Sequence, residues 1–263
     1  MGRLLIVLGL LLALPAASQT PVRVAIIIDD LGNSQQLGRQ AVELPGAVTY
    51  AILPQRPYSR EIARRAHARG REVMLHLPMQ TIDGRALGAG GLHLNMARDE
   101  FARELQASLS AVPYVSGVNN HMGSLLTQHP GAMRWLMEDL QCFDHLYFVD
   151  SRTDMRSVAR RYAQEAGVAN AQRDVFLDNE QDKDYVRAQF RHLIKKARQH
   201  GSAVAIGHPY PETLAVLAEE LPLLAAEGIQ LVPVSRLVER QRNERLWHAS
   251  SSPLPTAAKS SKQ

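Results

Sequence analysis

The chain of 263 residues is long enough for one large domain or two small ones, and its 45% hydrophobic and 21% charged residues can bury a sizeable core. This composition excludes a disordered, collagen-like or disulfide-stapled chain, and the single Cys142 excludes the four-cysteine zinc sites. The formal charge of +4 would suit nucleic acid or anionic lipid only if it lay on the folded part of the chain.

The first eighteen residues have the pattern of an export signal. Arg3 precedes an uncharged apolar run from Leu4 to Leu14, and Ala16-Ala17-Ser18 supplies the small residues that a signal peptidase needs. The apolar run is too short to span a bilayer as a helix. The sequence therefore predicts a cleavable signal peptide over residues 1–18 and a periplasmic protein. The alternative is an uncleaved inner-membrane anchor with the domain facing the periplasm.

Between residues 19 and 239, apolar runs alternate with helical patterns, as in parallel sheets that are covered on both faces. Phe101, Leu105 and Leu109 repeat at helical spacing, and Pro130 and Pro211 stand where a first helical turn begins. This pattern predicts one α/β domain, built as a βα barrel or as a doubly wound sheet. The predicted strands are residues 22–28, 47–53, 72–76, 115–119, 147–150, 174–177, 203–207 and 230–234.

In both architectures the active site lies beyond the carboxyl ends of the strands. Five of the predicted strands carry acidic, histidine or amide side chains to this edge. Their occurrence together indicates a functional site more specifically than any one of these motifs does. They are Asp29-Asp30 after the first strand, His76 to Gln80 at the third, Asn119 to Ser124 at the fourth, Asp150 to Thr153 at the fifth, and Gly207-His208-Pro209 at the seventh.

Such a set of side chains can support metal-assisted hydrolysis. A catalytic zinc takes three protein ligands, typically His and carboxylate, and lowers the pKa of its water to about 7. Asp30, His76 and His121 could supply these ligands to a divalent metal, with zinc as the expected ion. Asp29 could accept the proton of the water, provided that the strand ends or twists between the two Asp residues. Adjacent residues of a regular strand would otherwise point to opposite faces.

Two further side chains complete this hypothesis. His208 could protonate the leaving group, and Asp150 could orient His208 through a hydrogen bond. Each candidate also has a purely structural interpretation. These are a helix cap or turn for Asp29, buried hydrogen-bonded rings for His76 and His121, a rim ion pair for Asp150 and Arg152, and a turn residue for His208.

Three motifs resemble those of the polysaccharide deacetylases with NodB homology. The run Ile26 to Asp30 is similar to their first motif, in which the first Asp is the base and the second binds the metal. Residues 70–76 resemble the run into their first metal histidine, and Ala205 to His208 resembles the last motif, whose histidine is the general acid. The runs His-Leu-Pro-Met, Asn-Asn-His-Met-Gly-Ser and Val-Asp-Ser-Arg-Thr are closer to the divergent, YibQ-like branch of these proteins.

The resemblance runs from about Val22 to Val238. It implies a distorted (β/α) barrel of seven to eight mostly parallel strands, forming a single domain over residues 19–239. It also implies a metal-dependent hydrolase that removes N- or O-acetyl groups from an envelope or other carbohydrate, with a peptidoglycan-like polymer as the kind of substrate.

Two positions depart from the standard pattern of that superfamily. A second metal histidine is expected four residues after His76, where Gln80 stands, and the Arg-x-Pro-Tyr motif expected at the fourth strand is missing. By strand order, His121 could replace the absent ligand, and Arg152 could replace the arginine that orients the base. The alternative function is therefore an inactive barrel that binds glycans or a cell-wall enzyme. A phosphoesterase ranks last, because no basic phosphate clamp is evident.

From residue 240 onward the composition shifts to Arg, Ser, Pro, Ala and Lys without apolar periodicity, which predicts a disordered basic tail over residues 240–263. This tail carries five Arg and Lys residues against Glu244, and Arg3 lies in the signal segment, so residues 19–239 are close to neutral. The charge therefore predicts no nucleic-acid site on the domain. It leaves the tail as a candidate for weak contact with anionic envelope material.

Overall fold

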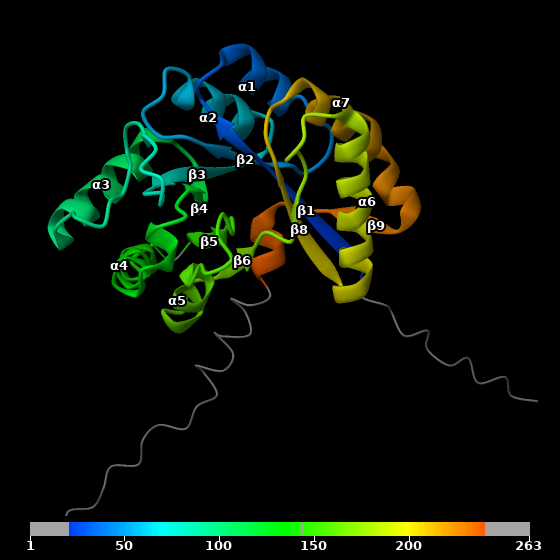
Figure 1. The fold of residues 1–263 in the computed structure, drawn as a ribbon. Helices are drawn as coiled ribbons and strands as arrows, with labels where there is room; N and C mark the ends of the chain where they lie inside the picture. The colour runs from blue at the N-terminus through cyan, green and yellow to red at the C-terminus, as the bar shows by residue number, and fades with distance from the viewer. Residues whose placement is uncertain (1–20, 144, 240–263) are drawn as a thin grey trace, which may run out of the picture.

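The computed structural model describes residues 21–143 and 145–239, so the predicted signal peptide and the basic tail lie outside the described residues. The described chain forms one parallel sheet that curls into a half-barrel and carries helices on its outer face (Figure 1). The predicted single-domain α/β fold with a distorted (β/α) barrel is thereby confirmed.

Nine strands make up this sheet in the described residues. Their bounds are β1 Val22–Leu31, β2 Thr49–Ile52, β3 Glu72–Met79, β4 Val115–Met122, β5 Tyr147–Asp150, β6 Asn170–Gln172, β7 Val175–Phe176, β8 Ser202–Gly207 and β9 Ile229–Leu231. They follow the order β6-β5-β4-β3-β2-β1-β8-β7, with β9 paired to β1, and the pairs are parallel. All carboxyl ends therefore meet at one edge of the sheet.

Several helices begin at a proline or at a side chain that caps the free N–H groups of the first turn. Pro130 and Pro211 occupy first turns as predicted, and the Asp182 carboxylate accepts a hydrogen bond from the Tyr185 N–H at 2.9 Å. None of the helices in the described part of the chain is long and apolar enough to cross a bilayer. The helices are α1 Gln35–Val42, α2 Ser59–Ala68, α3 Arg98–Ala111, α4 Pro130–Gln141, α5 Ala159–Glu165, α6 Lys183–His200 and α7 Pro211–Glu220, with 3-10 segments η1 Leu126–Gln128 and η2 Leu221–Glu227.

Alternate strand residues enter two hydrophobic layers. In β1, Ile26 and Ile28 pack with the layer that holds the helices, whereas Ala25 and Ile27 belong to the layer inside the half-barrel. Residues 234–239 are helical, and fully buried side chains of this segment complete the inner layer. The predicted last strand, 230–234, is therefore shorter than expected, because Pro233 has no N–H to continue a strand ladder.

Position 117 of β4 requires a glycine, because a neighbouring ring lies too close to the backbone to leave room for a side chain. It is paired with Tyr147 of β5, and a Cβ atom at this position would lie 2.4 Å from two atoms of that buried ring. We expect Gly117→Ala to lower the free energy of unfolding by about 1–3 kcal/mol, as overpacking does. Urea denaturation measures this change.

The matched control for this prediction is Gly131→Ala in α4. The added methyl group meets only the His129 ring, at 3.2 Å, and a helical glycine carries an entropic cost that alanine removes. This variant should therefore be as stable as the wild-type protein or slightly more stable. If Gly117→Ala and Gly131→Ala had the same effect, the packing of Gly117 against Tyr147 would be refuted.

Candidate active site

The end of β1 brings two consecutive carboxylates to one place. The pairing register between β1 and β2 shifts between Ile28 and Leu31, and Asp30 adopts a left-handed φ of 60°. This break in the pleat lets both Asp29 and Asp30 face His76 of β3, whose Nε2 lies 3.6 Å from Asp29 Oδ2 and 3.1 Å from Asp30 Oδ1. The twist that the sequence hypothesis required is therefore present.

Left-handed backbone recurs along this edge of the sheet. Gln55, Met122 and Arg152 have φ values of 52°, 56° and 47° and lie at or beyond the ends of β2, β4 and β5. Together with Asp30 they are four of the five non-glycine residues with positive φ in the described chain. Such conformations are strained for residues with a Cβ atom and concentrate at functional sites.

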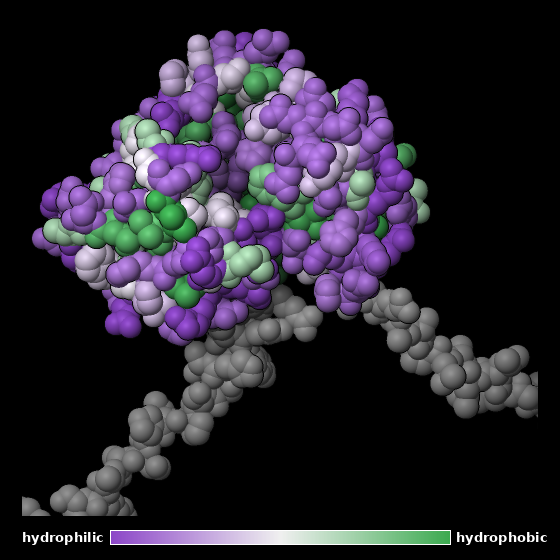
Figure 2. All heavy atoms as spheres, in the orientation of Figure 1, coloured by the Kyte–Doolittle hydropathy of each residue, from purple (hydrophilic) through white to green (hydrophobic). Residues whose placement is uncertain are grey.

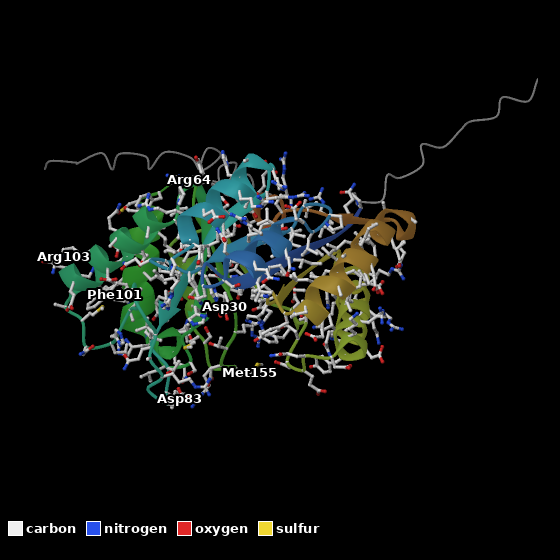
Figure 3. The ribbon with its side chains drawn as sticks, turned by 90° about the horizontal axis from the view of Figure 1, so that it is seen from above. Asp30, Arg64, Asp83, Phe101, Arg103 and Met155 are labelled. Carbon is white, nitrogen blue, oxygen red and sulfur yellow. The ribbon has the colours of Figure 1, made fainter. Side chains whose placement is uncertain are left out.

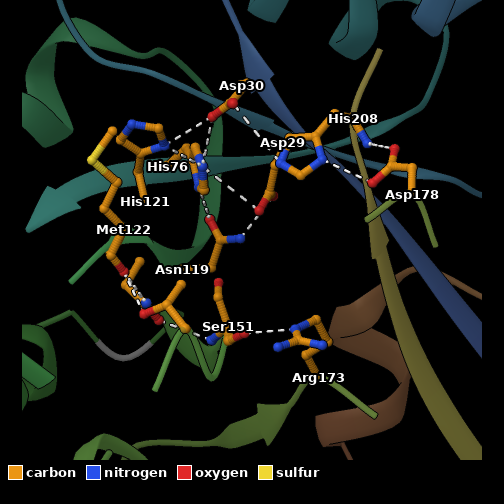
Figure 4. A network of polar contacts seen from close by, with 12 residues as sticks. Asp29, Asp30, His76, Asn119, His121, Met122, Ser151, Arg173, Asp178 and His208 are labelled. Atoms are coloured by element: carbon orange, nitrogen blue, oxygen red, sulfur yellow. Dashed lines mark hydrogen bonds and ion pairs between the residues drawn. The ribbon is translucent and has the colours of Figure 1, made fainter. Parts of the chain in front are cut away.

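The three predicted metal ligands converge from β1, β3 and β4 (Figure 4). Asp30 Oδ1 lies 3.1 Å from His76 Nε2 and 2.8 Å from His121 Nδ1, and the two ring nitrogens are 3.1 Å apart. A tetrahedral zinc ion with bonds of about 2.0–2.1 Å separates its ligand atoms by about 3.3 Å. The spacing and the chemistry of this donor set thus fit one small divalent cation.

Asp30 Oδ1 also lacks the partner that a buried oxygen needs. His76 Nε2 and His121 Nδ1 lie close to it, but Oδ1 makes no hydrogen bond with a side chain or backbone group of the described residues. A buried acceptor left unpaired is costly, and a cation at this point would satisfy it. Burial would raise the pKa of Asp30, but His121 and His76 hold it well below its usual range, so the carboxylate is ionised as a metal ligand must be.

Asp29 lies outside this triangle of ligand atoms. It is buried, and its Oδ1 accepts a hydrogen bond from Asn119 Nδ2 at 2.8 Å. Burial raises the pKa of Asp29 above its usual value, although the charges of His76 and His208 oppose the shift. A carboxylate with a raised pKa, placed beside the metal ligands, is suited to accept a proton.

His208 faces Asp30 from β8, on the other side of β1. Its Nε2 lies 3.8 Å from Asp30 Oδ2, and its Nδ1 donates to Asp178 Oδ1 at 3.0 Å. The buried Asp178 carboxylate is fixed in turn by the Thr213 hydroxyl and the His208 N–H. Burial would lower the pKa of His208, but Asp178, with Asp29 and Asp30, raises it to about 9. The ring is therefore protonated near neutral pH and can donate a proton.

Asp150 and Arg152 make other contacts than the predicted ones. The Asp150 carboxylate accepts hydrogen bonds from the Ser157 hydroxyl and the Arg152 N–H, whereas Asp178 orients His208. The predicted bond from Asp150 to His208 is wrong because four strands separate β5 from β8, whereas β7, which leads into Asp178, is the neighbour of β8. Arg152 Nη2 contacts Met155 Sδ at 3.3 Å, and the described residues show no ion pair between Arg152 and Asp29.

Three residues of the site were not predicted as functional: Asn119, Arg173 and Asp178. Asp178 directly follows the predicted strand 174–177, so the rule that located the other strand-end residues could have found it. Arg173 donates through Nε to the Ser151 carbonyl at 2.6 Å. Burial lowers the pKa of Arg173, and the Asp29 carboxylate is one of the charges that raise it. The Arg173 guanidinium thus anchors the loop after β5, through the Ser151 and Arg152 carbonyls.

Several known proteins are similar to this chain. The sequence model of one protein family, the divergent polysaccharide deacetylases, matches residues 26–238. The chain belongs to the divergent polysaccharide deacetylase family. The uncharacterized protein YibQ of Escherichia coli (strain K12) is 40% identical over 216 residues, which are 82% of this chain and 67% of that protein.

Two solved structures show the same fold. The uncharacterized protein ATU2773 from Agrobacterium tumefaciens C58 superposes with a TM-score of 0.80 at 24% identity, over 85% of this chain and 92% of that one. The peptidoglycan deacetylase PdaC from Bacillus subtilis superposes with a TM-score of 0.51 at 16% identity, over 88% of this chain and 98% of that one. The curled sheet that carries this site is thus shared with both of these structures.

Gln80 has a structural role in this member of the family. Its Oε1 accepts a hydrogen bond from the Leu94 N–H at 2.8 Å, and its carbonyl accepts from the Leu125 and Leu126 N–H groups. It thereby joins the loop after β3 to the loop after β4. His121, on the neighbouring strand β4, reaches the ligand triangle instead.

The loops beyond the strands gather on one side of the molecule. Figure 3 shows Asp30 near the centre of the molecule, with Asp83 and Met155 toward this side and Arg64 toward the other. The face drawn in Figure 2 is largely hydrophilic and hollowed near its centre, between the part that holds α1 to α5 and the part that holds α6 and α7. A polar, open face of this kind suits a hydroxyl-rich ligand.

Proposed function

We propose that this protein is a metal-dependent deacetylase that removes N- or O-acetyl groups from an envelope carbohydrate. The observation that carries the proposal is the convergence of Asp30, His76 and His121 on one point, with Asp29 and His208 beside it. The fold shared with the peptidoglycan deacetylase PdaC supports a peptidoglycan-like substrate.

The five side chains divide the chemistry between them. Asp30, His76 and His121 would hold the metal, with zinc as the expected ion. When bound, a divalent ion polarises an acyl carbonyl and lowers the pKa of water. Asp29 accepts a proton from the water that attacks the acyl carbon. His208 donates a proton to the departing amine nitrogen or alcohol oxygen as its bond to the acyl carbon breaks, and acetate is released.

The two proton-transfer groups start in the protonation states that this reaction needs. His208 is held as a cation by Asp178, so it enters the reaction with a proton to give. Asn119 Nδ2 donates a hydrogen bond to Asp29 Oδ1, which favours the ionised carboxylate, the form that can take a proton. The chain therefore supplies an acid and a base beside Asp30.

Metal analysis and an acetate assay of the purified, untagged protein test this proposal. We expect about one divalent ion per chain, lost on treatment with a chelator. Metal removal should also lower the thermal unfolding temperature, because a ligand bound only to the folded state stabilises it. Loaded protein should release acetate from an N-acetylated or O-acetylated oligosaccharide.

The same assay separates the enzyme from the alternative function. Loaded protein that binds the oligosaccharide but releases no acetate would favour the inactive, glycan-binding barrel. The observation that favours this alternative is the structural use of Gln80 where a second histidine was expected. Protein without a metal, before and after incubation with zinc, would refute the assigned ligands.

The periplasm is the proposed location, on the sequence pattern of residues 1–18. Cell fractionation and N-terminal sequencing of the native protein test it, and we expect a mature chain that begins near residue 19. Recovery of the full-length chain with the inner membrane would favour the uncleaved anchor. Deletion of residues 240–263 tests the envelope contact proposed for the basic tail, and it should weaken association with cell-wall material.

A further inference from the structure

Asn119 of β4 lies between the proposed base and a proposed metal ligand (Figure 4). Its Nδ2 donates to Asp29 Oδ1 at 2.8 Å, and its Oδ1 lies 2.8 Å from His76 Nδ1. All three side chains are buried, with exposed fractions of 0% for Asn119, 3% for Asp29 and 2% for His76. One amide group thus connects two residues to which the proposed function gives different tasks.

Asp29 fixes the orientation of this amide. An ionised carboxylate can only accept hydrogen bonds, so the Asn119 NH₂ group must face Asp29 and the Asn119 carbonyl must face His76. A carbonyl oxygen also only accepts, so His76 Nδ1 must carry a proton. The neutral imidazole has one N–H, which leaves a lone pair on Nε2. That atom is the one that faces Asp30 and His121.

Without Asn119, His76 has a competing choice of tautomer. Its Nε2 lies 3.1 Å from Asp30 Oδ1, close enough for a proton on Nε2 to bind this carboxylate after a small rotation of the ring. A buried Nδ1–H without an acceptor would favour that exchange, because an unpaired buried donor is costly. The proton would then occupy the atom that a metal ion needs.

We propose that Asn119 is a positioning residue that keeps the proton of His76 on Nδ1, and so leaves Nε2 free for a metal ion, while it holds Asp29 in place. The inference rests on the proposed function for the presence of the metal. The tautomer of His76, by contrast, is a property of this chain alone. Residues that orient a metal-binding histidine in this way commonly tune its affinity for the ion.

Asn120 provides a matched control on the same strand. It is also buried, but its Oδ1 accepts from the Ser151 N–H at 2.8 Å and its Nδ2 donates to the Met122 carbonyl at 2.7 Å. Neither contact involves Asp29 or His76. Replacement of Asn120 therefore removes a buried amide of β4 without changing the surroundings of the His76 ring.

The test compares wild-type protein with Asn119→Leu, Asn119→Asp and Asn120→Leu, all as full chains. Long-range ¹H–¹⁵N NMR spectra of metal-free, ¹⁵N-histidine-labelled protein report the tautomer, at a pH where His76 is neutral. We expect the Nδ1–H form in wild type, Asn119→Asp and Asn120→Leu, and the Nε2–H form in Asn119→Leu. Zinc affinity, measured by competition with a chelator, should fall about 10–100-fold in Asn119→Leu and be retained in the other two variants.

Asn119→Asp separates the two contacts, because its carboxylate still accepts from His76 Nδ1 but repels Asp29. We expect this variant to keep zinc and to lose about tenfold or more of its acetate release. Wild-type protein with the His76 proton on Nε2 would overturn the inference, even if Asn119→Leu does not fold. An unchanged tautomer together with unchanged zinc affinity in folded Asn119→Leu would overturn it as well.

Measurement of the tautomer also separates a failure of this inference from a failure of the proposed function, because the tautomer is measured without metal. A wild-type protein with the proton on Nδ1 but without acetate release would support the position of Asn119 and count against the enzyme activity alone.

Discussion

Asp29→Asn is expected to lower the rate of acetate release by a factor of about 10²–10⁴ and to leave zinc binding intact. An amide has nearly the shape of the carboxylate and still accepts from Asn119 Nδ2, but it cannot take a proton from water. Asp29 lies outside the triangle of ligand atoms, so the metal content should stay at the wild-type level. Steady-state acetate release and metal analysis of the same sample measure both effects.

The control for this variant is Asp154→Asn, on the loop after β5. The Asp154 carboxylate pairs with Arg156 at 2.9 Å, and the hydrogen bonds and ion pairs of its side chain in the described residues are with Arg156. Acetate release should stay near the wild-type rate in this variant. If Asp29→Asn turned over as fast as Asp154→Asn, Asp29 would not be the base.

His76→Ala is expected to abolish metal binding. The proposed site offers an ion three protein ligands, and removal of one would leave Asp30 and His121 alone. The loss of affinity should exceed the factor of about 10–100 that removal of an outer partner of a ligand costs. Inductively coupled plasma mass spectrometry of the purified variant measures the metal content, and acetate release should fall with it.

His67→Ala serves as the control for the loss of an imidazole. His67 lies in the last turn of α2 and stacks on Tyr114 at a ring separation of 3.8 Å, near the start of β3 and not at the strand ends that carry Asp30. The metal content of this variant should equal that of the wild-type protein. Full metal occupancy in His76→Ala would show that the ligands had been assigned wrongly.

The fold follows largely from local patterns in the sequence. All eight predicted strands coincide with observed ones in whole or in part, because a strand buried on both faces must be apolar along its length. The edge strand β6 escaped prediction because Asn170–Gln172 is short and partly polar. The last predicted strand was shifted by the proline that ends β9 and by the helical segment 234–239.

The candidate site was predictable to the extent that it depends on strand ends. A parallel sheet gathers all of its carboxyl ends at one edge, so Asp29, Asp30, His76, His121 and His208 could be grouped from their positions alone. The positions of the strand ends do not determine which of these side chains contact each other. Sequence distance gave no means to choose between Asp150 and Asp178 as the partner of His208.

The sequence by itself determined that this chain forms a parallel sheet covered by helices and that acidic and histidine side chains gather at one edge of it, because strand composition and strand order along the chain suffice for both. The choice of a curled barrel over a doubly wound sheet came from the resemblance to the deacetylases. Only the tertiary structure decided the partners. The order of strands in space places β7 beside β8, and hence Asp178 against His208. The left-handed turn at Asp30 brings two adjacent carboxylates to one side. Hydrogen bonds depend on distances below about 3.2 Å, and such distances are set by packing between strands that lie far apart in the sequence.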